Sequence, residues 1–128
     1  MAKRDERDSF PGFAECMRLM RRRDPQQMED GFHLLQARAH EFVPELIAEF
    51  RGESKHGLRC WLLELLGYAR SEAAYPLFLE FLESEDESLR DWAIRGLREL
   101  DTKEARRTLW AANLHPRSPG MRRARDGA

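Results

Sequence analysis

Cysteines are scarce in this chain, and a long apolar run is missing. The 128 residues include only Cys16 and Cys60, too few for a disulfide scaffold, so reduced thiols and a cytoplasmic setting are expected. No run approaches the roughly 18 apolar residues that span a bilayer. The charged residues 1–8 lead into no apolar segment, so we expect neither a secretory signal nor a membrane partner.

A large net charge is also missing. The formal net charge of −1 gives no overall field that would gather nucleic acid or acidic membranes. The charges nevertheless form three blocks: Arg18, Arg21, Arg22 and Arg23; then Glu80, Glu83, Glu85, Asp86 and Glu87; and finally Arg117, Arg122, Arg123 and Arg125. A solvated helix face accounts for the first block, and contact with a phosphate or an acidic protein is the alternative.

A repeat is present, with a shift of 31 residues between its copies. Residues 58–79 align with residues 89–110, and both begin with Leu-Arg-x-Trp. The apolar residues of each copy follow the spacing 0, 3, 4, 7, 8, 11, which is one face of an α-helix. They are Leu58, Trp61, Leu62, Leu65, Leu66 and Ala69 in the first copy, and Leu89, Trp92, Ala93, Gly96, Leu97 and Leu100 in the second. The two tryptophans share one repeat position, which favours core packing over base stacking.

Each of these helices is followed by a polar turn and a second helix. The turn at residues 71–72 precedes a helix at residues 74–82. The turn at residues 101–104 precedes the last helix, which Asp101 and Glu104 are expected to cap. Because the two helices and their turn recur together, the pattern indicates true structural repeats.

The upstream part of the chain supplies a third helix pair and a separate first helix. Residues 42–50 match residues 74–82 after a shift of 32 residues, and both segments carry a proline in the first turn. A less regular helix is expected at about residues 26–39, and a terminal helix within residues 10–23. The fold class is therefore predicted to be all-α, a short right-handed α-solenoid of two to three antiparallel helix pairs plus an N-terminal helix.

The length of the chain argues for one domain. We expect this domain to cover residues 1–115. It divides into a flexible start at residues 1–9, the N-terminal helix at residues 10–23 and the repeats at residues 24–115. Residues 116–128 are expected to form a flexible basic tail.

The pattern resembles the HEAT and HEAT-like solenoid repeats over roughly residues 24–115. This resemblance implies that the second helices line one, often concave, face that binds a partner. Two positions depart from the family pattern. Gly67 stands where the family often has glycine, but its repeat-mate is Arg98, and Arg107 replaces the second-helix proline. These departures predict that the third unit is a cap.

No constellation for catalysis or metal binding emerges from the sequence. His56 and Cys60 are four residues apart on one helix, but two ligands do not make a zinc site. His40-Glu41 is similar to the His-Glu pairs of HEAT-repeat hydroxylases, which need several such pairs. The other histidines, His33 and His115, have no ligand-like spacing. A non-enzymatic protein without cofactor or metal is predicted.

The second helices carry the candidate binding patch. Their expected core positions are Val43, Leu46, Ile47 and Phe50 in one helix and Tyr75, Phe78, Leu79 and Leu82 in the next. The intervening positions should face outward, and among them Leu77 and Phe81 stack four residues apart. With Glu45, Glu49 and Glu80 around them, they are predicted to form an apolar patch with an acidic rim. Packing of the two apolar residues under a neighbouring helix is the alternative.

Binding of another protein through the second-helix face is the function these features favour. An acidic face suits a basic toxin or enzyme, so one concrete form is a bacterial immunity or antitoxin-type inhibitor. An adaptor or assembly factor is another form. A nucleic-acid-binding HEAT-like protein is the alternative, and it would use the arginines at residues 18–23 and 117–125. An enzyme is disfavoured because no ligand motif repeats.

Overall fold

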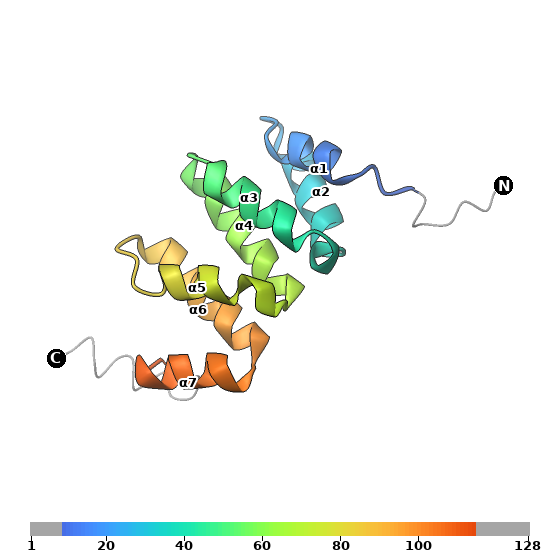
Figure 1. The fold of residues 1–128 in the computed structure, drawn as a ribbon. Helices are drawn as coiled ribbons and strands as arrows, with labels where there is room; N and C mark the ends of the chain where they lie inside the picture. The colour runs from blue at the N-terminus through green and yellow to red at the C-terminus, as the bar shows by residue number, and fades with distance from the viewer. Residues whose placement is uncertain (1–8, 115–128) are drawn as a thin grey trace.

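The computed structural model describes residues 9–114, which form an all-helical stack without a strand (Figure 1). The predicted all-α solenoid is confirmed. The predicted basic tail, and all but the last residue of the predicted flexible start, lie outside the described residues. The helices are α1 (Phe13–Met20), α2 (Pro25–Gln36), α3 (Val43–Gly52), α4 (His56–Ala69), α5 (Tyr75–Phe81), α6 (Glu87–Leu100) and α7 (Lys103–Ala111).

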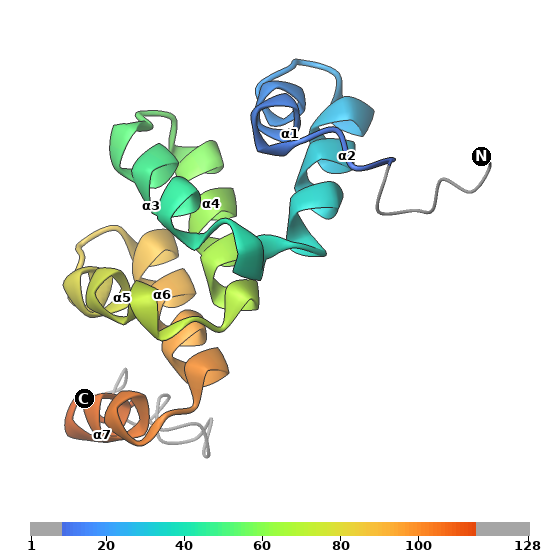
Figure 2. The ribbon, with the colours of Figure 1, turned by 45° about the vertical axis from the view of Figure 1, so that its right-hand side comes forward.

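The hairpin unit of the stack begins with the shorter helix. Helix α3 packs against α4, and α5 packs against α6, while α4 and α6 also contact each other broadly. Helices α3 and α5 therefore lie on one side of the stack, and α4 and α6 lie on the other (Figure 2). The sequence alignment paired α4 with α5, which is the same repeat in a frame shifted by one helix.

Two glycines set the distance between α4 and α6. A Cβ atom at Gly67 would lie 3.6 Å from the Cα atom of Gly96, so the two backbones approach each other at this crossing. The sequence alignment matched Gly67 with Arg98, but the residue that faces it in space is Gly96. A side chain at Gly96 would overlap the buried ring of Phe78, which packs against this part of α6.

Gly31 explains the irregular pattern of α2. A Cβ atom there would lie 2.6 Å from the backbone oxygen of Cys16 and 3.0 Å from Met20, so α2 needs glycine to pack on α1. Cys16 is fully buried at this contact. Burial raises the pKa of its thiol to about 11, which keeps it neutral and unreactive at physiological pH.

Helices α1 and α2 are shorter than predicted. Helix α1 covers Phe13–Met20 inside the expected residues 10–23, and α2 ends at Gln36 instead of residue 39. Asp24 caps α2 in an extended conformation ahead of Pro25, which disfavours a helical residue just before it.

The predicted cap of the last helix is wrong. The Thr102 side chain is the N-cap, and its hydroxyl accepts a hydrogen bond from the Ala105 amide at 3.0 Å. Asp101 instead ends α6 in a left-handed conformation with φ 50°. Since the cap is Thr102, Glu104 stands one residue too early to complete a capping box.

Replacing Thr102 with alanine is expected to lower the free energy of unfolding by about 1 kcal/mol, because the Ala105 amide loses its acceptor. The measurement is urea denaturation followed by circular dichroism. The control is Glu104→Ala in the same helix turn, which should change stability by less than about 0.5 kcal/mol. A larger loss from Glu104→Ala than from Thr102→Ala would restore the predicted cap.

Candidate functional site

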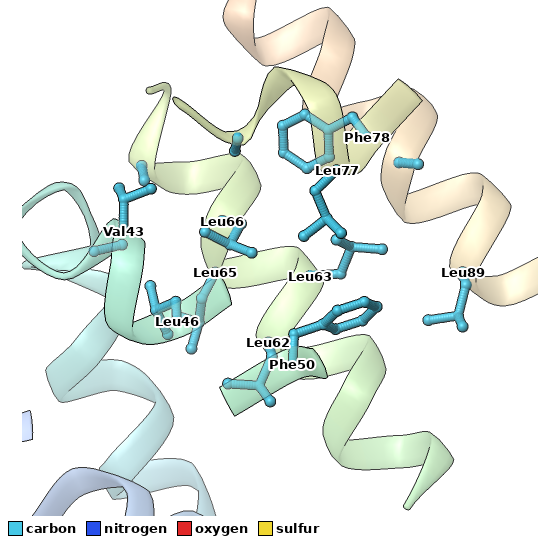
Figure 3. Packing of buried hydrophobic residues seen from close by; sticks show 14 of the residues in the cluster. Val43, Leu46, Phe50, Leu62, Leu63, Leu65, Leu66, Leu77, Phe78 and Leu89 are labelled. Carbon is cyan, nitrogen blue, oxygen red and sulfur yellow. The ribbon is translucent and has the colours of Figure 1, made fainter. Parts of the chain in front are cut away.

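The structure reverses the predicted roles of two leucines in α5. Leu77 was predicted to face outward but is 2% exposed, and Leu79 was predicted to be core but is 44% exposed. Figure 3 shows Leu77 pointing into the core toward Leu63. The reason is a rotation of α5 about its axis. Its buried face runs through Ala74, Leu77, Phe78 and Leu82, a regular helical stripe that the alignment with α3 did not indicate.

Phe81 lies at the edge of the core and not in an open patch. Its ring is half-buried and makes an edge-on contact with the buried ring of Phe50, with 5.2 Å between the centroids. The guanidinium of Arg59, from α4, lies 4.2 Å from the Phe50 centroid and 5.6 Å from the Phe81 centroid. Phe81 therefore packs where α3, α4 and α5 meet, and only part of its side chain is open to a partner.

The predicted acidic rim is largely paired within the chain. Arg51 binds the Glu80 carboxylate through two nitrogens, at 2.8 and 3.2 Å. Arg21 binds Glu49 at 2.8 Å and also binds Glu53 at 2.9 Å. The hydrogen bond from Arg51 holds the pKa of Glu80 below its ordinary value. Among the three rim carboxylates, only Glu45 is exposed without an ion pair to another described residue.

The arginine block divides into paired and exposed members. Arg18 pairs with Glu15 on α1 at 3.0 Å, and Arg21 joins the end of α1 to α3 through its two glutamates. Two carboxylates of the chain itself therefore neutralise Arg21, which the sequence had offered as a contact for an anionic partner. Arg22 and Arg23 are exposed, and neither forms an ion pair within residues 9–114.

Sequence reasoning missed a row of apolar residues on α3, α5 and α7. Ile47, Leu79 and Trp110 occupy the same repeat position, after shifts of 32 and 31 residues. Ile47 is half-buried, Leu79 is 44% exposed and Trp110 is 66% exposed. We call these three residues the apolar row. Their shared repeat position, with Trp110 at the end of the alignment, was the signal that could have found them.

Two polar contacts hold the helices of the apolar row side by side. The Arg51–Glu80 pair joins α3 to α5. The hydroxyls of Tyr75 and Thr108 are 2.7 Å apart and join α5 to α7. Helices α3, α5 and α7 accordingly form one side of the stack in Figure 2. The repeat therefore carries the apolar row across three neighbouring helices.

The histidine and cysteine pair on α4 does not form a catalytic relay. The Nε2 atom of His56 lies 2.9 Å from Asp86 and 3.7 Å from the Cys60 sulfur, so one ring nitrogen faces both groups. A relay would need the other nitrogen for one of them. Burial also raises the pKa of the Cys60 thiol, which disfavours the nucleophilic thiolate.

The described part of the chain offers no set of side chains that could bind a metal ion. His40 approaches only its neighbour Glu41, at 4.0 Å, and is exposed. Residues 9–114 contain no group of three or more histidine, cysteine, aspartate or glutamate side chains that could hold a metal ion. None of the helices described here is long and apolar enough to cross a membrane.

Stacked helical hairpins that bury one continuous stripe define this protein as an α-solenoid. The chain matches the family model for HEAT repeats over residues 43–126, and it belongs to the HEAT-repeat family. HEAT repeats generally mediate protein–protein interactions. The match begins at the first residue of α3, in agreement with the structure, where the α3–α4 hairpin begins with that helix. No curated protein and no solved structure matches the chain.

Proposed function

We propose that this protein is a non-enzymatic interaction module whose protein partner docks on the side formed by α3, α5 and α7. The apolar row carries this proposal. Leu79 and Trp110 are large apolar side chains, and both are well exposed on helices that the repeat places next to each other. Exposed apolar groups that cluster on one face are typical of the centre of a protein interface, and tryptophan is the residue most enriched there.

The charges around the apolar row fit the polar rim of such an interface. Glu45 on α3 is exposed, and Arg107 on α7 is exposed at the other end, where Arg106 is paired with Asp101 at 3.0 Å. The Arg51–Glu80 pair lies between them at the surface. This mixture suits a partner with both acidic and basic groups opposite the row.

An inhibitor of a basic toxin is one form of this function. The inhibitor hypothesis was based on an acidic face. That face now depends mainly on Glu45, because Glu49 and Glu80 are paired with arginines. An adaptor or assembly factor would use the same geometry. Nucleic acid has less support as a partner, because Arg18 and Arg21 are paired with glutamates.

The test is a pull-down from the native cell lysate at moderate salt, with and without nuclease. The intact protein is expected to retain one stoichiometric, nuclease-resistant protein partner. The double variant Leu79→Ala/Trp110→Ala should bind that partner at least about tenfold more weakly, which corresponds to about 1.4 kcal/mol at an interface centre. Its thermal unfolding should remain near that of the intact protein, because both side chains are exposed.

The control for this test is Asp91→Ala, since Asp91 is exposed on α6, and α6 lies on the other side of the stack from α3 and α5 (Figure 2). Unchanged capture by the double variant would remove the apolar row from the interface. Recovery of nuclease-sensitive nucleic acid without protein would favour the nucleic-acid function. Once a partner is purified, loss of its enzymatic activity in the complex separates an inhibitor from an adaptor.

A further inference from the structure

The side of the stack formed by α4 and α6 carries a shallow groove. Gly67 and Gly96, where the backbones of α4 and α6 come close together, are among the residues that line it. Tyr68 and Trp92 stand at its walls. The groove is shallow and open, and the space inside it is far below the roughly 300–1,000 Å³ of small-molecule pockets. A side chain of a larger partner would therefore lie across the groove at the surface and would not enter a pocket.

Glu64, a carboxylate in this groove, forms no ion pair within residues 9–114, although Arg95 in the same groove stabilises its charge weakly. Glu64 is half-buried, and its hydrogen bond comes from the Tyr68 hydroxyl at 3.3 Å. Burial raises the pKa of Glu64, with smaller opposing effects from Tyr68 and Arg95. Glu99, at the other end of the groove, is bound by Arg70 at 2.7 Å. Glu64 thus keeps a partly desolvated negative charge that a bound cation would stabilise.

The aromatic walls are suited to a guanidinium group. The guanidinium of Arg95 already lies 4.9 Å from the centre of the Trp92 ring, so the chain itself places a cation against this wall. Trp92 was expected in the core but is only half-buried. The Tyr68 ring is 45% exposed next to Glu64. A second cation could stack on Tyr68 and reach the carboxylate at the same time.

We propose that this groove binds an arginine side chain of a basic protein segment, which stacks on Tyr68 and pairs with Glu64. Arginine fits better than lysine, because its planar guanidinium can stack on the ring while it donates hydrogen bonds to the carboxylate. The residues that line the groove belong to α4 and α6, which Figure 2 shows on the other side of the hairpins from α3 and α5. The proposal for this groove is therefore independent of the function proposed for the apolar row.

The probe is a capped tetra-arginine peptide, titrated into the full-length ¹⁵N-labelled protein and followed by two-dimensional NMR. The largest shifts are expected at the Trp92 indole N–H and at the amides of Gly67 and Gly96. The indole of Trp110 serves as an internal reference that should stay unchanged. Capped tetralysine should bind more weakly than tetra-arginine.

Two variants with the same change of charge make the test specific. Glu64→Gln is expected to raise the Kd for tetra-arginine about fivefold, the upper range for a partly exposed ion pair. Glu83→Gln removes an equally negative but exposed group after α5 and should leave the Kd unchanged. Tyr68→Ala should reduce the preference for arginine over lysine.

Several results would overturn the proposal. Equal weakening by Glu64→Gln and Glu83→Gln would show a general attraction to acidic surface and no built site. Shifts at the Trp110 indole in place of the Trp92 indole would move the peptide to the side of the apolar row. Shifts of Trp92 that depend on protein concentration in the absence of peptide would assign the groove to a second copy of the chain.

Discussion

Replacing Leu77 with alanine is expected to lower the free energy of unfolding by about 2–5 kcal/mol, the usual cost of a large-to-small change in a core. Leu77 is 2% exposed, so the truncation leaves a cavity beside Leu63 and Phe78 (Figure 3). Chemical denaturation followed by circular dichroism measures this loss.

The matched control for Leu77 is the same substitution two residues later. Leu79 is 44% exposed, so Leu79→Ala should change the free energy of unfolding by no more than about 0.5 kcal/mol. Similar losses from both variants would mean that α5 is not rotated as the structure has it. A large loss from Leu79→Ala alone would restore the register predicted from the alignment with α3.

Replacing Gly96 with alanine is expected to lower the free energy of unfolding by about 1–2 kcal/mol. The added methyl group overlaps three carbon atoms of the Phe78 ring, which is fully buried and must shift to admit it. Overpacking of this kind costs about 1–3 kcal/mol. It outweighs the gain of up to about 1 kcal/mol that alanine brings to a helix interior.

Gly67→Ala is the control at the same helix crossing, and its effect should have the opposite sign. The new methyl group would meet the Gly96 Cα atom at 3.6 Å, an ordinary van der Waals contact. The higher helix propensity of alanine should then raise the free energy of unfolding by up to about 1 kcal/mol. Thermal unfolding of both variants side by side gives the result. Stabilisation by Gly96→Ala would contradict the packing of Phe78 on α6.

The two sides of the stack differ in what sequence reasoning could find. The apolar row could have been predicted from the sequence, because its three members share one repeat position. The groove on α4 and α6 was not accessible, since Gly67 and Gly96 have different places in their repeats. Their meeting depends on how far one helix slides along the other, and local spacing does not carry that information.

The pairing of two carboxylates of the predicted acidic rim was hidden from the sequence for a related reason. Glu49 and Glu80 have no arginine at helical spacing that would have indicated their pairing. Their partners, Arg21 and Arg51, are 28 and 29 residues away in sequence. Ion pairs over such separations form only when helices that are distant in sequence become neighbours. The charge available to a partner can therefore be counted only in the folded chain.

The sequence by itself determined the helical class, the presence of repeated helix pairs and most of the buried stripe. These properties depend on contacts within one helix turn and on a repeat, which spacing records directly. Only the tertiary structure decided which side of the short α5 is buried, which charges remain unpaired and where two glycines meet. Each of these depends on how one packed helix is rotated and shifted along another. The sequence does not determine this rotation or shift, because several faces of a helix have similar polarity until the stack has formed.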